Sequence, residues 1–177
     1  LDGVVIEGLS TLAINDKVDD FIRHTLNARP ASLGQYGYEF VLNSSINDVV
    51  CHGVPSATQI LKAKDIVNLD DSSKMYVMSD ANLIAKRLVK TAYEAMWAGI
   101  KKVKPGATLG DIGAAIQTLA ESKGYSVVKE YCGHGIGREM HEEPQVLHYG
   151  KAGTGLVLEE GMTFTIEPMI NQGKAKT

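Results

Sequence analysis

A helix stop followed at once by a helix start constrains the fold of this chain more than any other feature of its sequence. Residues 82–103 carry apolar side chains at helical spacing, and the sequence KPG at 104–106 ends that helix because proline lacks a backbone donor. Thr108 and Asp111 then have the spacing at which a side-chain hydroxyl caps the free N–H groups of a new helix. The sequence therefore predicts two consecutive helices, the second of which ends near a capping Gly124.

Shorter segments complete the pattern. A further helix is predicted over residues 15–27, before the other two. Strands are predicted at 65–70, 74–78, 125–131 and 162–167. The first and third helices each follow a Thr-Leu pair and lead towards an extended run and a histidine, which suggests an internal duplication. No linker or low-complexity segment interrupts the chain, so we expect one α+β domain over residues 1–177.

Composition narrows the classes of function. The 177 residues include 44% hydrophobic and 22% charged side chains, as in an ordinary globular protein, and the net charge is -3. No run of Lys and Arg supports a nucleic-acid interface, and no apolar run or signal peptide indicates a membrane or secreted protein. Cys51 and Cys132 are too few for a disulfide framework. We therefore expect a cytoplasmic protein without nucleic-acid or membrane partners.

Three of the five histidines lie between residues 130 and 149, in the sequence EYCGHGIGREMHEEPQVLHY. Two familiar motifs are excluded there. HEEPQ lacks the second histidine of HExxH, and Pro144 would break the helix that this zinc motif needs. GHGIG has its third glycine one place too early for the dinucleotide-binding pattern GxGxxG.

A divalent-metal site is another explanation for this block. The strand over 125–131 would deliver His134 to a tight turn between two glycines. Glu167 would end the strand over 162–167 on its polar face, and Asp70 and Asp71 would end another strand. Imidazole and carboxylate oxygens are common ligands of divalent metals.

Plainer interpretations of these residues stay open on spacing alone. Glu167 could be a loop-boundary carboxylate, and Asp70 with Asp71 a solvated turn. His24 and His148 have the pattern of ordinary surface or partly buried histidines.

Four segments together resemble the type I methionine aminopeptidases of bacteria. They are INDVVCHGVP at 46–55, DIVNLD at 65–70, YCGHGIGREMHEEPQVLHY at 131–149 and GMTFTIEPM at 161–169, and the resemblance covers essentially the whole chain. It implies the pita-bread fold, an antiparallel sheet covered by helices with internal pseudo-two-fold symmetry. It also implies a cytoplasmic, monomeric hydrolase that removes the initiator methionine from nascent polypeptides with a small second residue. The ribosome is a further candidate partner.

The resemblance also implies a cofactor, since the family binds two divalent metal ions. Co, Mn, Fe and Zn all suit its ligands, which are two aspartates, one histidine and two glutamates. The positions that match these ligands are Asp70, Asp71, His134 and Glu167. The second glutamate has no match before Thr177.

Catalytic and substrate-binding roles follow from the same resemblance. Glu167 would accept the proton of the attacking water as well as bind metal. His141 would stabilise the developing oxyanion, and His52 would contact the amide nitrogen of the substrate. Tyr38 and Met140 match positions that line the methionine pocket, although plain core packing is the alternative for both.

The sequence departs from the family pattern in two places. Asp70 and Asp71 are adjacent, whereas a hairpin separates the two aspartates in the family, and neighbouring side chains on a strand point to opposite faces. The chain also starts at Leu1 and stops before the second glutamate. We therefore expect that a segment is missing at the 70/71 junction and another after residue 177.

Two other functions stay open at this point. The first is a metal-free pseudoenzyme that binds peptides or a ribosome, which an intact mass near 19.1 kDa would favour. The second is a proline-cleaving or creatinase-like hydrolase of the same fold, although such enzymes usually carry a large N-terminal domain that this sequence does not show.

Overall fold

The computed structural model describes residues 3–69 and 73–175, and these form two compact units. The first unit comprises Leu1–Lys86 and the second Arg87–Thr177. Asp70 and Asp71, two of the expected metal ligands, lie outside the described residues. In the part of the chain that is described, no helix combines the length and the apolar character needed to cross a membrane.

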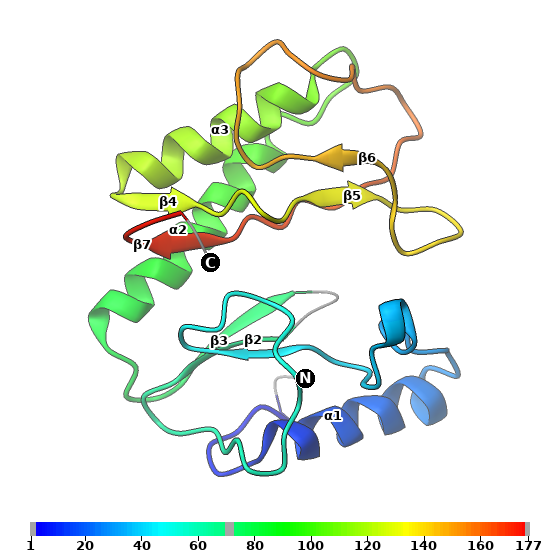
Figure 1. The fold of residues 1–177 in the computed structure, drawn as a ribbon, viewed down its shortest axis with the longest axis vertical. Helices are drawn as coiled ribbons and strands as arrows, with labels where there is room; N and C mark the ends of the chain where they lie inside the picture. The colour runs from blue at the N-terminus through cyan, green and yellow to red at the C-terminus, as the bar shows by residue number, and fades with distance from the viewer. Residues whose placement is uncertain (1–2, 70–72, 176–177) are drawn as a thin grey trace. The chain divides into compact units, whose positions relative to one another are not determined.

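The first unit contains a helix and a three-stranded antiparallel sheet with the order β1-β2-β3 (Figure 1). Its elements are α1 (Thr11–Asp20), a π-helical turn (Phe21–Thr25), a 3₁₀ turn (Gln35–Gly37), β1 (Ser44–Ile46), β2 (Ile66–Leu69) and β3 (Lys74–Val77). Ile14 and Val18 of α1 share a buried cluster with Val67 and Leu69 of β2. The helix is therefore held against the sheet by apolar contacts.

The first helix begins earlier than the sequence predicts. It starts at Thr11 instead of residue 15, because Ser10 Oγ accepts a hydrogen bond from the Ala13 N–H at 3.1 Å and so caps the first turn. Its α-helical part ends at Asp20, and the predicted remainder is a π-helical turn followed by irregular backbone. Ser10 is the sequence signal for this earlier start, and it precedes the apolar repeat on which the prediction was based.

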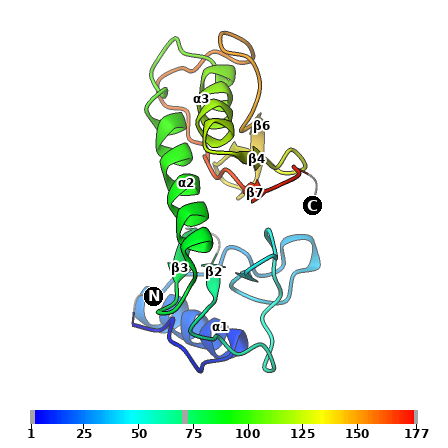
Figure 2. The ribbon, with the colours of Figure 1, turned by 90° about the vertical axis from the view of Figure 1, so that its left-hand side faces the viewer.

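The second unit contains two long helices and two pairs of antiparallel strands. Its elements are α2 (Leu83–Ile100), whose first turn belongs to the first unit, α3 (Leu109–Ser122), β4 (Tyr125–Val127), β5 (Gly133–Gly135), β6 (Glu142–Val146) and β7 (Ile170–Gln172). β4 pairs with β7, and β5 pairs with β6. Figure 2 shows α2 and α3 next to each other, with these strands along one side of α3.

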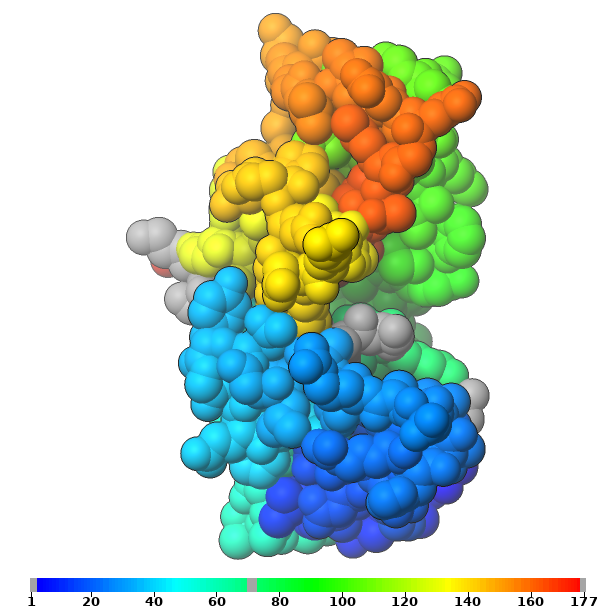
Figure 3. Space-filling view, turned by 90° about the vertical axis from the view of Figure 1, so that its right-hand side faces the viewer, coloured from blue at the N-terminus to red at the C-terminus, as the bar shows by residue number. Residues whose placement is uncertain are grey.

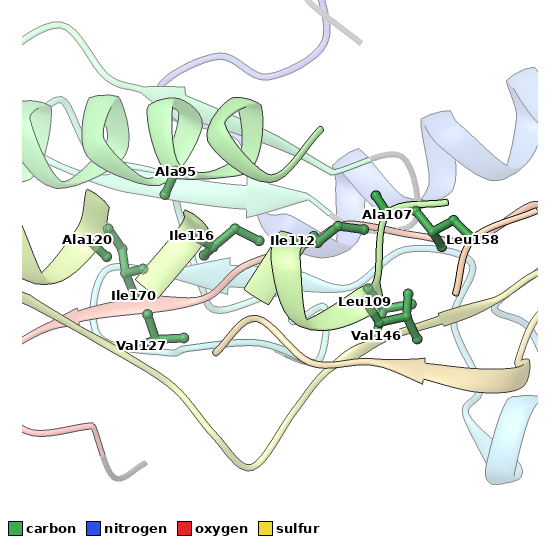
Figure 4. Close-up of a cluster of buried hydrophobic side chains, with 10 residues drawn as sticks. All are labelled: Ala95, Ala107, Leu109, Ile112, Ile116, Ala120, Val127, Val146, Leu158 and Ile170. Atoms are coloured by element: carbon green, nitrogen blue, oxygen red, sulfur yellow. The ribbon is translucent and has the colours of Figure 1, made fainter. Parts of the chain in front are cut away.

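A single buried cluster holds the helices of the second unit on its strands (Figure 4). Ile112 and Ile116 of α3 are fully buried between α2 and the strands. Gly99 allows the two helices to approach closely, since a Cβ at this position would lie 2.7 Å from Ile116 Cδ1. Val146 of β6 belongs to this cluster, so β6 is anchored to the helices, and β5 is anchored through its pairing with β6.

The helix signals around residues 104–111 are confirmed. α2 ends at Ile100, and α3 begins with a capping box in which Asp111 N donates to Thr108 Oγ1 at 3.2 Å and Thr108 N donates to Asp111 Oδ2 at 2.8 Å. The helix ends at Ser122, and Gly124 follows with φ +82°. The α+β class is confirmed as well.

The strand predicted over 162–167 is wrong, because only Phe164 forms a bridge, with Gly135. Backbone groups and threonine hydroxyls both contribute to this pairing. Ile136 N donates to the carbonyl of Thr163 at 3.0 Å, and Thr165 N donates to that of His134 at 2.8 Å. His134 N donates to Thr165 Oγ1 at 2.9 Å, and Thr163 Oγ1 donates to the carbonyl of Ile136. The segment is therefore extended without a regular ladder. Phe164 and Ile166 pack on the core while Thr165 bonds to Glu167, so Glu167 lies on the polar face of the segment, as predicted.

Candidate metal centre

His134 lies in the middle of strand β5, and not at the tight turn that the sequence predicts. The flanking glycines are required by close packing on both sides. A Cβ on Gly133 would lie 2.4 Å from the carbonyl oxygen of Thr165, and a Cβ on Gly135 would lie 2.2 Å from that of Glu143. Two neighbouring segments are therefore pressed against the backbone that carries His134.

The imidazole of His134 is held in one tautomer. Its Nδ1 lies 2.9 Å from the carbonyl oxygen of Gly135, which only accepts, so Nδ1 carries the hydrogen. Nε2 then lies 3.4 Å from Glu167 Oε1. Two electron-pair donors this close repel each other unless the ring is protonated or a cation lies between them.

This donor set fits a divalent metal. A metal-binding histidine normally donates its second N–H to a carbonyl or carboxylate, as His134 does to Gly135. Both side chains are largely shielded, with 17% of His134 and 31% of Glu167 exposed. Among the described residues, no group of three or more His, Cys, Asp or Glu side chains could hold a metal, so this pair provides only part of a ligand set.

His141 lies beside His134. Their ring centroids are 4.4 Å apart, with the planes tilted by 56°. His141 ends a loop over 136–141 that is exposed from Ile136 to Glu139 and that Figure 3 shows in yellow at the surface of the second unit. The half-buried Met140 precedes it. The structure therefore brings together three of the site residues expected in this unit, His134, Glu167 and His141. A fourth, Met140, is adjacent to His141 in the sequence.

Glu142 holds the loop that carries His141. Its Oε1 accepts the N–H of Glu139 at 3.0 Å, and a Cβ on Gly137 would lie 2.4 Å from its Oε2. The carboxylate therefore folds back onto the loop and braces it. Glu142 therefore has a structural role in this loop, away from the His134–Glu167 pair.

His148 is a residue whose place the sequence interpretation missed. It is only 1% exposed, and its Nε2 accepts the backbone N–H of Glu167 at 3.1 Å. Burial lowers the pKa of His148 to about 4, so the ring is neutral at neutral pH. The prediction that it is an ordinary surface or partly buried histidine is wrong. The other such histidine, His24, is exposed and lies 3.8 Å from Asp20.

Cys132 is next to β5 but is poorly suited to nucleophilic chemistry. Burial raises the pKa of its thiol, and the negative charges of Glu167 and Glu143 raise it further. Because the thiolate is the reactive form, this cysteine stays protonated and inert at neutral pH.

Two expected substrate residues lie together in the first unit. The Tyr38 hydroxyl lies 3.0 Å from the carbonyl oxygen of Leu42 and 3.3 Å from that of Gly53, which follows His52. His52 has φ +53°, a region that few non-glycine residues adopt. A Cβ on Gly53 would lie only 2.1 Å from the carbonyl oxygen of Ser44, so the chain is packed tightly against β1. His52 is thus held in a strained conformation of the kind found at functional sites.

Comparisons with a family model and with known proteins agree on one family for this chain. The model of metallopeptidase family M24 matches residues 3–176. The methionine aminopeptidase of Escherichia coli K12 is 46% identical over 184 residues, covering 98% of this chain and 70% of that protein. That of Rickettsia prowazekii is 49% identical over 179 residues, covering 96% and 68%.

Solved structures agree with the sequence comparisons. The crystal structure of methionine aminopeptidase from Rickettsia prowazekii has a TM-score of 0.93 and 47% identity, covering 98% of this chain and 73% of that one. The expected pita-bread fold and the resemblance to methionine aminopeptidases are confirmed. With a family model that matches nearly its whole length and relatives almost half identical to it, the chain belongs to metallopeptidase family M24.

Proposed function

We propose that this protein is a metal-dependent methionine aminopeptidase that removes the initiator methionine from nascent polypeptides with a small second residue. The observation that carries the proposal is the pair His134 Nε2 and Glu167 Oε1, 3.4 Å apart, with the His141 ring beside it. The names of the relatives support the same reaction, because those relatives are methionine aminopeptidases.

The proposed cofactor is two divalent ions of Co, Mn, Fe or Zn, bound by Asp70, Asp71, His134 and Glu167. When bound, a divalent metal would supply a water of lowered pKa as nucleophile and would polarise the carbonyl to be attacked. The ligand set is a proposal from the motif, with support at His134 and Glu167 from their fixed geometry. We also propose that the protein works as a monomer in the cytoplasm, with the ribosome as a candidate partner.

The protein's own residues have separate tasks in the proposed reaction. Glu167 takes the proton of the attacking water through a carboxylate oxygen. His141 donates a hydrogen bond to the carbonyl oxygen as it gains negative charge. His52 contacts the amide nitrogen and helps the leaving amine to take a proton. Tyr38 and Met140 receive the methionine side chain, and the flexible, polarisable thioether of Met140 suits that ligand.

Metal dependence is the test of this proposal. EDTA should abolish aminopeptidase activity, and added Co²⁺ or Mn²⁺ should restore it. His134→Ala should lose bound metal and activity together, because the imidazole is a direct ligand. His24→Ala is the matched control, since this histidine is exposed and its partner is Asp20. Undiminished activity in excess EDTA, with no metal found by elemental analysis, would contradict the proposal and favour a metal-free function.

A further inference from the structure

A single hydroxyl group connects the two halves of the candidate metal centre. Thr165 Oγ1 accepts the backbone N–H of His134 at 2.9 Å and lies 2.6 Å from Glu167 Oε1. We propose that Thr165 is the positioning residue that sets the Glu167 carboxylate against the His134 imidazole, and that it thereby raises the affinity of this pair for a divalent metal. The inference rests on the proposed function, because it assumes that the pair binds metal.

The direction of these hydrogen bonds is fixed by chemistry. A backbone N–H only donates, so Thr165 Oγ1 must be the acceptor from His134. An ionised carboxylate only accepts, so the single hydrogen of the hydroxyl goes to Glu167 Oε1. The hydroxyl has therefore one orientation that satisfies both partners. It joins them in one chain from the His134 backbone to the carboxylate.

The hydroxyl bonds to the same oxygen atom that faces the imidazole. Glu167 Oε1 is at once the acceptor from Thr165 and the atom 3.4 Å from His134 Nε2. His148 already fixes the backbone of Glu167 through its N–H at 3.1 Å. The hydrogen bond from Thr165 restricts the side-chain torsions of Glu167, because it holds the carboxylate oxygen that faces the imidazole. Outer partners of this kind typically affect metal affinity by about 10- to 100-fold.

Thr163 is a natural control in the same segment. Its hydroxyl donates to the carbonyl of Ile136, beyond the His134–Glu167 pair, and its side chain is exposed. Thr163 and Thr165 are two residues apart in an extended segment, so both lie on its polar face. Thr163→Val and Thr165→Val therefore remove the same group from the same strip of backbone, but only the second breaks a contact with a proposed ligand.

The experiment is a calorimetric titration of EDTA-treated protein with Mn²⁺. Thr165→Val should weaken Mn²⁺ binding by about 10-fold or more, as expected for loss of an outer partner. Thr165→Ser keeps the hydroxyl and should restore most of the affinity, and Thr163→Val should bind as the wild type does. Thermal melting of each metal-free variant checks that it is folded. Thr165→Ala provides a second hydroxyl-free variant in case valine is not tolerated.

The outcomes separate this inference from the proposed function. Wild-type Mn²⁺ affinity in a folded Thr165→Val or Thr165→Ala protein would overturn the role of Thr165 and leave the metallopeptidase assignment intact. An equal loss in Thr163→Val would overturn it too, because the effect would then belong to the segment as a whole. A wild-type protein that neither binds Mn²⁺ nor releases methionine would overturn both proposals.

Discussion

Hydrogen bonds from neighbouring residues hold the side chains of the candidate metal centre in place. His134 Nδ1 bonds to Gly135, the backbone N–H of Glu167 bonds to His148, and Glu167 Oε1 accepts from Thr165. These contacts set His134 Nε2 and Glu167 Oε1 facing each other. The His141 ring lies beside that of His134, with 4.4 Å between the ring centroids. We therefore expect a separation of roles, in which His134 and Glu167 hold metal and His141 contacts the substrate.

Replacement of His141 tests that separation. His141→Ala should lower kcat/KM by about 10²-fold or more, which is the usual effect of losing a positioned acid–base or oxyanion group. Metal content should stay near that of the wild type, because this imidazole is not expected to be a ligand. Elemental analysis and steady-state kinetics on the same preparation measure both quantities. A fall of metal occupancy in step with activity would make His141 a ligand instead.

For individual site residues, the resemblance of whole sequence segments to a family predicted more than the residue types and their spacing did. His134, Glu167 and His141 were expected together, and the structure places them together. His148 and Thr165 were missed because their importance comes from hydrogen bonds to residues 19 and 31 positions away in sequence. A buried histidine has no distinctive local pattern, so only the folded structure reveals it.

Helix positions in this chain can be predicted from local sequence signals, whereas strand positions depend on the segments with which the strands pair. α3 depends on a capping box and on an apolar stripe that can be read from the sequence itself. β5, β6 and β7 have three to five residues each, and their pairing joins segments that lie apart in the chain. The sequence predicted none of these three strands, since short strands are specified by cross-strand contacts more than by intrinsic preference.

The cap of α3 gives a pH-dependent prediction. Hydrogen bonds from the N–H groups of Thr108 and Gly153, and from the Thr108 hydroxyl, lower the pKa of Asp111 below its usual value. A carboxyl with a lowered folded-state pKa stabilises the fold above its unfolded pKa of about 3.9, and this contribution is lost as pH falls through the folded-state value. Asp111→Asn should therefore lower the melting temperature at pH 7, and the difference from the wild type should shrink towards pH 3.

Melting curves by circular dichroism at several pH values measure this difference. Glu121→Gln is the matched control, because the Glu121 carboxylate lies on the same helix and accepts from the Gln117 side chain at 2.7 Å instead of capping the start of the helix. It should show no comparable loss at pH 7. A difference between Asp111→Asn and wild type that is equally large at pH 3 would mean that the charge of Asp111 is not the cause.

For the whole molecule, the family could be identified from sequence while parts of the site could not be placed. The motif around His134 is long and specific, and comparison with relatives confirms the family over residues 3–176. Asp70 and Asp71 fall outside the described residues, so their assignment as ligands rests on the motif. Tyr38 and His52 belong to the first compact unit, and His134, His141 and Met140 belong to the second. That these residues act together in one reaction is thus a prediction, which an assay of enzyme activity can test.

Substrate specificity tests that joint action. If Tyr38 and Met140 both receive the first side chain, the protein should accept a long, unbranched, uncharged residue and require a free N-terminal amine beside the metal. The second residue should be small, such as Gly, Ala, Ser, Cys, Thr, Pro or Val, because a crowded metal centre excludes larger side chains. Steric exclusion discriminates more strongly than one missing methylene, which contributes only about 1–3 kcal/mol.

Rates of methionine release from Met-Ala-x, Met-Gly-x and Met-Lys-x peptides, with Leu-Ala-x and N-acetyl-Met-Ala-x as controls, measure each requirement separately. Fast cleavage of Met-Lys-x or of the acetylated peptide by the metal-loaded protein would contradict the assignment, whereas cleavage confined to Met-Ala-x and Met-Gly-x would support both the pocket and the reaction.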